Sequence, residues 1–160
     1  MGELRRRHVL FGVSCAAVTA TVATALVLVF SGDSKAAPTK AEYFARVAVI
    51  CRVYGPQLDK IRPPDVSEPA SVIVAIQAVF PLLEAQQRDV RALRAPEELR
   101  TKLARWFDLH DRRLGMLEEA LRAAHKQDYL ALSVAYVDFV LAAPQTARLG
   151  KAIGFPHPPC

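Results

Sequence analysis

The sequence predicts an all-α protein, with an N-terminal transmembrane helix followed by an antiparallel four-helix bundle that a disulfide closes. Three observations carry this prediction. Residues 9–30 form an uncharged apolar run, four later segments repeat apolar residues every three or four positions, and two cysteines, Cys51 and Cys160, follow the run. Because no stretch alternates apolar and polar residues over the length of a strand, we expect no sheet.

Residues 9–30 are predicted to form a transmembrane signal-anchor helix. At about 1.5 Å of rise per residue this run reaches about 33 Å, enough to cross a hydrocarbon core of about 30 Å. The arginine cluster at residues 5–7 precedes it. Basic residues favour the cytoplasmic side, so residues 1–8 are expected to be a cytoplasmic tail and the chain after Phe30 to lie outside the cytoplasm.

Two alternatives to a retained anchor remain open at this point. The run is longer than the apolar core of a signal peptide, which spans about 7–15 residues, yet Ser34, Lys35 and Ala36 form a small-residue site for cleavage before Ala37. Lipidation at Cys15 is the other alternative. In each case the remainder of the chain is exported.

Small residues suggest that the anchor packs against another helix. Gly12, Ala16 and Ala20 recur every four residues, a spacing that allows two helices to approach closely in lipid. The simpler interpretation is that the anchor is only rich in alanine.

The positive charge of the chain does not indicate nucleic-acid binding. The formal net charge is +5, but three of the 21 lysines and arginines form the cluster at residues 5–7, which the topology explains. The exported part has no concentrated basic block with interleaved aromatic residues, the usual pattern in nucleic-acid-binding proteins.

Cys51 and Cys160 are expected to form a structural disulfide. They are the two exported cysteines, and disulfides persist outside the cytoplasm. The bridge would hold down a proline-rich end of the chain, and closing a loop of about a hundred residues contributes up to about 4.7 kcal/mol in the chain-entropy model. A redox-active pair would be spaced more closely, as in Cys-x-x-Cys.

Residues 31–38 form a short linker, and the bundle is predicted over residues 39–160. Thr39 and Glu42 make a capping box that begins the first helix. Gly55 and Pro56 predict a kink within it. Its apolar stripe consists of Tyr43, Val47, Ile50, Tyr54, Leu58 and Ile61.

The second helix is expected to begin at a cap provided by Ser67 and to bend or break near Pro81. Two glutamines, Gln86 and Gln87, interrupt its apolar stripe. That stripe consists of Val72, Ile76, Val79, Leu83, Val90 and Leu93.

The third helix is expected to begin at Pro96, because proline and the two following glutamates suit a first helical turn. Its apolar stripe is the most regular in the chain, and it contains one histidine. The stripe consists of Leu99, Leu103, Trp106, His110, Leu114, Leu117 and Leu121.

The fourth helix is predicted to begin near Asp128, to kink at Pro144 and to end at Gly150 or Gly154. Four helices with short connections pack as an up-down-up-down bundle. The positions that we expect to be buried are Leu130, Val134, Val137, Leu141 and Ala147, flanked by Tyr129, Tyr136 and Phe139.

The residues that most resemble a chemical site are Asp108, His110 and Asp111. The two carboxylates share one helix face while the imidazole points away from Asp108, so we predict no metal site. His110 is interpreted as a core histidine, with pH sensing as the alternative. Trp106 is expected to fill the core rather than to stack on a ligand. No catalytic motif is found, so a non-enzymatic protein without a cofactor is expected.

Arg105, Arg112 and Arg113 give the third helix a basic side. The ordinary interpretation is a solvated face whose charges pair with neighbouring carboxylates. The more specific interpretation is a docking surface for anionic lipid or a protein partner.

Residues 39–160 resemble a loose group of small exported helical proteins of unknown function from actinobacteria. The resemblance lies in the segments at residues 43–51 and 93–99, and in an ending with Leu149-Gly150, Gly154-Phe155-Pro156 and Cys160. It implies a helical bundle in the cell envelope, with an early cysteine paired to one at the end of the chain, and it supplies no catalytic residues.

These observations lead to two functional hypotheses. The first is an accessory or scaffold subunit of a cell-envelope membrane complex, anchored in the cell membrane by a single pass and joined to a membrane-protein partner. The alternative is an extracytoplasmic module that binds a lipid or another apolar ligand in a gap between its helices, which kinks at Pro56, Pro81 and Pro144 would open.

Overall fold

The computed structural model describes residues 37–155, and this part of the chain is all-helical. Its elements form one compact unit. The predicted anchor over residues 9–30 and Cys160 lie outside the described residues. The elements are α2 (Lys40–Leu58), α3 (Pro69–Ala92), the 3₁₀ turn η1 (Glu97–Leu99), α4 (Arg100–His125) and α5 (Tyr129–Ile153).

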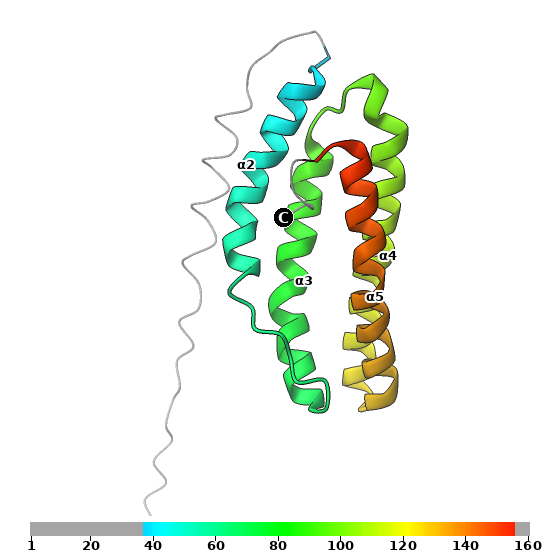
Figure 1. The fold of residues 1–160 in the computed structure, drawn as a ribbon. Helices are drawn as coiled ribbons and strands as arrows, with labels where there is room; N and C mark the ends of the chain where they lie inside the picture. The colour runs from blue at the N-terminus through cyan, green and yellow to red at the C-terminus, as the bar shows by residue number, and fades with distance from the viewer. Residues whose placement is uncertain (1–36, 156–160) are drawn as a thin grey trace, which may run out of the picture. The chain divides into compact units, whose positions relative to one another are not determined.

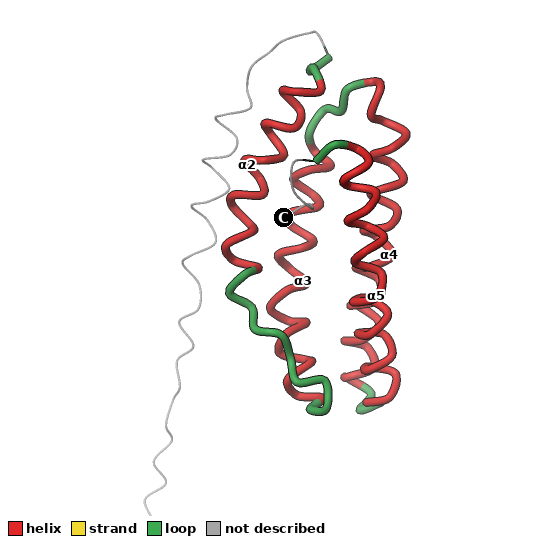
Figure 2. The backbone as a smooth tube through the Cα atoms, in the orientation of Figure 1, coloured by secondary structure: helices red, strands yellow, loops and turns green. Residues whose placement is uncertain are grey.

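Consecutive helices run in opposite directions, and the longest, α4, packs most extensively against α5 (Figure 1). Short loops join them, except for the longer segment between α2 and α3 (Figure 2). This arrangement is the helical bundle that the sequence predicts, and the all-α fold class is confirmed for the described residues.

The core divides into two hydrophobic clusters. The α2 cluster joins Tyr43, Val47 and Ile50 of α2 to residues of α3, α4 and the end of α5. The three-helix cluster, which includes Ile76, Leu117 and others, draws its residues from α3, α4 and α5 alone. Because α2 has 19 residues while α4 has 26, α2 covers only one half of the bundle.

Local signals in the sequence set the helix ends. Thr39 and Glu42 form the predicted capping box, with the Thr39 amide donating to Glu42 Oε2 at 2.7 Å. Asp128 caps α5 by accepting a hydrogen bond from the Ala131 amide at 3.0 Å. Gly154 ends α5 with φ at 101°, a left-handed conformation that favours glycine.

The prediction that Ser67 caps α3 is wrong. The N-cap of α3 is Glu68, and Ser67 instead donates to Asp65. Pro69 explains the difference, because its fixed φ suits the first helical position. Pro81 does not break α3, which continues to Ala92. Helices α2 and α5 likewise continue through Pro56 and Pro144.

The stripe predicted for α4 is confirmed at its centre, where Leu103, Trp106 and Leu117 are at most 2% exposed. The stripe predicted for α5 is wrong. Leu130 is 77% exposed and Leu141 is 70% exposed, and Val134 and Val137 are also exposed. The buried positions of α5 are instead Leu132, Ala135, Phe139, Thr146, Gly150 and Ile153.

The physical reason is that α5 has two apolar stripes on opposite sides. Residues two positions apart, such as Leu130 and Leu132, lie about 200° apart around a helix. Both stripes have helical spacing, so periodicity alone does not tell which one faces the core.

The two leucines provide a direct test of which stripe is buried. We expect Leu132→Ala to lower the free energy of unfolding by about 2–5 kcal/mol, because it leaves a cavity in a fully buried site. Leu130→Ala should change it by less than about 0.5 kcal/mol. Chemical denaturation of the dilute, detergent-solubilised full chain, followed by circular dichroism, measures both values. Equal losses would contradict the orientation of α5.

Candidate functional site

A layer of buried polar side chains separates the two hydrophobic clusters. Gln86 and Gln87 on α3, His110 on α4 and Thr146 on α5 are all at most 7% exposed. On α4, His110 lies between Trp106 of the α2 cluster and Leu117 of the three-helix cluster. We call these four residues the central polar layer.

Several polar atoms in and beside this layer lack a hydrogen-bond partner among the described residues. They are Gln86 Nε2, Gln87 Oε1, Trp106 Nε1, His110 Nε2 and Arg113 Nε. A buried polar group without a partner costs about 1–3 kcal/mol. The layer is therefore the least favourable part of the core, and it includes the two glutamines that interrupt the stripe of α3.

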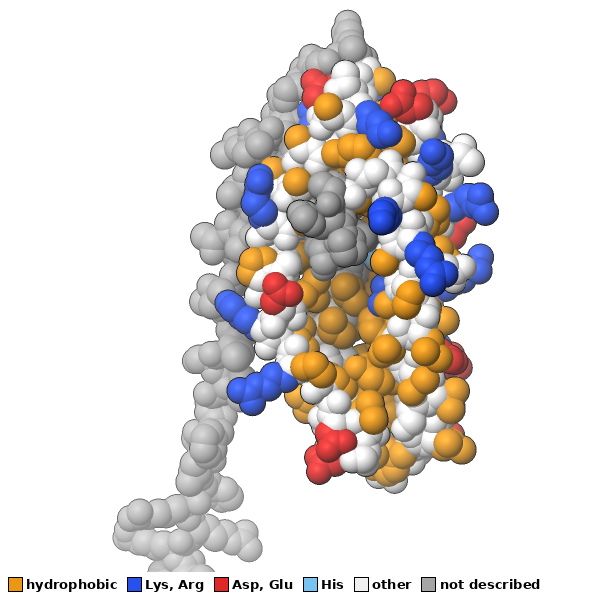
Figure 3. All heavy atoms as spheres, viewed as in Figure 1, with side chains coloured by type: hydrophobic (Ala, Val, Ile, Leu, Met, Phe, Trp, Pro, Cys, Tyr) orange, Lys and Arg blue, Asp and Glu red, His pale blue; other side chains and the backbone are white. Residues whose placement is uncertain are grey.

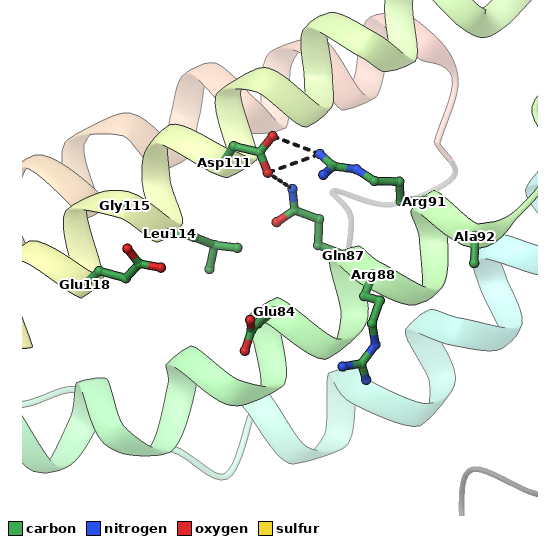
Figure 4. Close-up of a pocket in the computed structure, with 9 residues that line it drawn as sticks. All are labelled: Glu84, Gln87, Arg88, Arg91, Ala92, Asp111, Leu114, Gly115 and Glu118. Atoms are coloured by element: carbon green, nitrogen blue, oxygen red, sulfur yellow. Dashed lines mark hydrogen bonds and ion pairs between the residues drawn. The ribbon is translucent and has the colours of Figure 1, made fainter.

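On one side the layer reaches a surface groove of about 680 Å³ between α3 and α4 (Figure 4). There Asp111 accepts hydrogen bonds from Gln87 Nε2 at 2.6 Å and from Arg91 Nη2 at 2.9 and 3.1 Å. Glu84 and Glu118 line another part of this groove. The Arg91–Asp111 ion pair is about half exposed, so it contributes little to stability.

His110 is held in its neutral form. Its ring lies 4.0 Å from that of Trp106, measured between centroids. The pKa of His110 is lowered from 6.5 to about 4, chiefly by burial and in part by the nearby positive charge of Arg113, while Asp111 acts in the opposite direction. The imidazole is thus a core side chain near neutral pH, as predicted.

The structure does not bring Asp108, His110 and Asp111 together as metal ligands. Asp108 is exposed, His110 is buried and Asp111 is bonded to α3. Among residues 37–155, no group of three histidine, cysteine or acidic side chains is placed to hold a metal ion.

The three arginines predicted to form a partner surface divide into two environments. The Arg113 guanidinium lies 4.4 Å from the centre of the Phe139 ring and is partly buried. Burial lowers its pKa. Arg105 and Arg112 are exposed and line a second groove, of about 540 Å³, together with Asp108 and Arg148. The basic side therefore comprises Arg105, Arg112 and Arg148 rather than Arg113.

The most extensive unusual surface is the apolar face of α5, which sequence reasoning assigned to the core. We define this face by six side chains that are 45–77% exposed: Tyr129, Leu130, Val134, Val137, Val140 and Leu141. Hydrophobic side chains gather over this part of the molecule in Figure 3. Two further exposed valines, Val66 and Val74, lie near the beginning of α3.

By length and composition, α3 and α5 are each apolar enough to cross a membrane, yet only 22% of the most apolar stretch of each is buried. Both helices therefore carry apolar residues that the bundle leaves uncovered.

Gly12, Ala16 and Ala20, predicted to form a packing face of the anchor, lie outside the described residues. Comparisons of the chain with protein-family models, with curated proteins and with solved structures found no match. The resemblance to small exported actinobacterial proteins therefore remains a prediction from the sequence.

Two adjacent glutamines test the cost of the central polar layer. Gln86→Leu is expected to leave the free energy of unfolding unchanged or to raise it by about 1 kcal/mol, because it removes a buried amide nitrogen without a partner. Gln87→Leu should lower it by about 1–2 kcal/mol, since the hydrogen bond to Asp111 is lost. Urea denaturation of the full chain compares them. A destabilising Gln86→Leu would show that this amide is hydrogen-bonded in solution.

The lowered pKa of His110 predicts a loss of stability in acid. Below pH 6.5 the unfolded chain binds a proton at this position, whereas the folded chain does not until the pH nears about 4. Between pH 7 and pH 5 this difference should remove roughly 2 kcal/mol from the free energy of unfolding. Denaturation of the wild-type chain and of His110→Leu at both pH values isolates this contribution. The loss of unfolding free energy between pH 7 and pH 5 should be smaller by that amount in His110→Leu. Identical losses in the two chains would refute the lowered pKa of His110.

Proposed function

We propose that this protein is a non-enzymatic accessory or scaffold subunit of a cell-envelope membrane complex. A single N-terminal anchor would hold it in the cell membrane, with the bundle outside the cytoplasm. The observation that carries the proposal is the apolar face of α5, because an exposed apolar surface of this extent marks a site of interaction.

The sequence supports the membrane location. The uncharged run over residues 9–30 follows the basic cluster at residues 5–7, which favours a cytoplasmic N-terminus. The linker over residues 31–38 spans at most about 28 Å when fully extended, so it would keep the bundle close to the membrane surface.

A disulfide between Cys51 and Cys160 is part of the proposal. Cys51 lies on α2 and packs against the α2 cluster. Phe155 is buried in the same cluster, where its ring packs against Phe44 and Trp106 at centroid distances of 5.7 and 5.3 Å. Five residues after Phe155 are enough to return the chain to α2, which favours the bridge.

The alternative function, a module that binds a lipid or another apolar ligand, is favoured by the same exposed apolar side chains. The apolar face of α5 is open, however, whereas small-ligand sites are concave and enclose most of their ligand. The two grooves described above are lined largely by charged and polar residues. An extended partner surface therefore fits the apolar face better than a single lipid molecule.

The basic side of α4 and α5 offers a second contact region. Arg105, Arg112 and Arg148 surround a shallow groove whose one carboxylate is that of Asp108. We propose this groove as a secondary contact with an acidic protein surface or with anionic headgroups.

The docking role predicts what will co-purify with the full chain from native membranes. We expect the double variant Leu130→Glu, Leu141→Glu to reduce the recovery of membrane-anchored partners, including a differently tagged copy of this chain, by about tenfold or more, because it places carboxylates in an apolar interface. Mass spectrometry with quantified peptides measures the recovery.

The matched control is Thr101→Glu, Ala104→Glu, which adds the same charges at exposed positions of α4. This control should retain the partners. An unchanged set of partners in the Leu130, Leu141 variant would overturn the proposed docking surface.

A further inference from the structure

We propose that the partner of the apolar face of α5 is a second copy of this chain, packed α5 against α5 about a two-fold axis. This inference rests on the proposed function of the face as a docking surface, and it names the partner. A two-fold interface uses the same patch on both subunits, so a single self-complementary surface is sufficient.

The spacing of the face suits helix-on-helix packing. Leu130, Val134, Val137 and Leu141 follow one another at intervals of four, three and four residues. These are the intervals of the seam of a coiled coil, in which two helices pack side by side with interlocking side chains. The stripe continues along the helix for about three turns, so two copies could align over much of α5.

The charge distribution permits two identical faces to meet. Between Tyr129 and Ala147, Asp138 is the one charged residue of α5. It lies about 80° around the helix from Leu130, which places it at the rim of the seam. Close packing of two copies would therefore bury no like charges at the centre.

The size of the face also agrees with a dimer. The four side chains of the seam, Leu130, Val134, Val137 and Leu141, are 45–77% exposed and therefore available to a partner. A specific protein–protein interface buries about 800 Å² on each partner, so the seam would form its centre and flanking side chains of each copy would complete it.

A bilayer surface is a poorer match. Helices that lie in the membrane interface carry tryptophan, phenylalanine or leucine on one side and many lysines and arginines at its border. The α5 face is rich in valine and leucine, and no lysine or arginine occurs between Tyr129 and Ala147. The anchor would instead help by confining two copies to one membrane plane, which raises their effective concentration.

Photo-crosslinking of the full chain in native membranes tests this inference. A photoreactive benzoylphenylalanine replaces Val137, which lies at the centre of the seam. Irradiation should give a product of twice the chain mass, and mass spectrometry should identify the Val137 region joined to α5 of the same protein. The same photoreactive residue in place of Lys102, exposed on α4, should give at least about tenfold less of this product.

Adding Leu130→Glu and Leu141→Glu should reduce the dimer product by about tenfold or more, whereas Thr101→Glu and Ala104→Glu should leave it within about twofold. A cross-link from Val137 to a different membrane protein would overturn self-association while supporting the docking role. Two outcomes would overturn both proposals. One is a cross-link from Val137 to lipid alone, and the other is the absence of any protein cross-link, both in the mass of the products and in their peptides.

Discussion

A helix can turn only one side toward a single core, and this constraint decides which apolar residues of the bundle are buried and which are exposed. Helix α5 is apolar on two opposite sides, and the bundle buries the side that contains Leu132, Ala135 and Phe139. The other side then has to face outward. Its exposure follows from the two stripes rather than from loose packing, because Leu132 and Leu117 in the adjoining cluster are completely buried.

The interior is also uneven along its length. On one side of the central polar layer all four helices contribute to the α2 cluster. On the other side α3, α4 and α5 alone form the three-helix cluster, because α2 ends at Leu58. Between them, Gln86 and His110 occupy positions that apolar residues would fill more favourably. Buried polar groups can fix the register between helices in some proteins. Here the hydrogen bond from Gln87 to Asp111 links α3 and α4 at one level, which is consistent with that role.

Signals that act locally were predictable from the sequence. The capping box at Thr39, the start of α5 near Asp128 and the centre of the α4 stripe depend on residues within one or two helical turns, and each is confirmed. The buried side of α5 was not predictable, because two stripes of equal spacing compete and only contacts with α3 and α4 decide between them. The inward orientation of Arg113 likewise depends on Phe139, which is distant in sequence. Within the candidate site, the sequence analysis singled out His110, Gln86 and Gln87. It did not predict that they lie in the same central polar layer.

The error in α5 is informative about function. The exposed side carries only large apolar side chains over three turns, whereas the buried side mixes the large Leu132, Phe139 and Ile153 with the smaller Ala135, Thr146 and Gly150. Small residues are sufficient on the buried side, because the chain itself connects α5 to the rest of the bundle. A partner that arrives from outside has no such help, and large side chains at regular intervals give it more surface to bind. The exposed side of α5, with its unbroken stripe of large side chains, is thus suited to association, while the buried side mixes large and small residues and is used for folding.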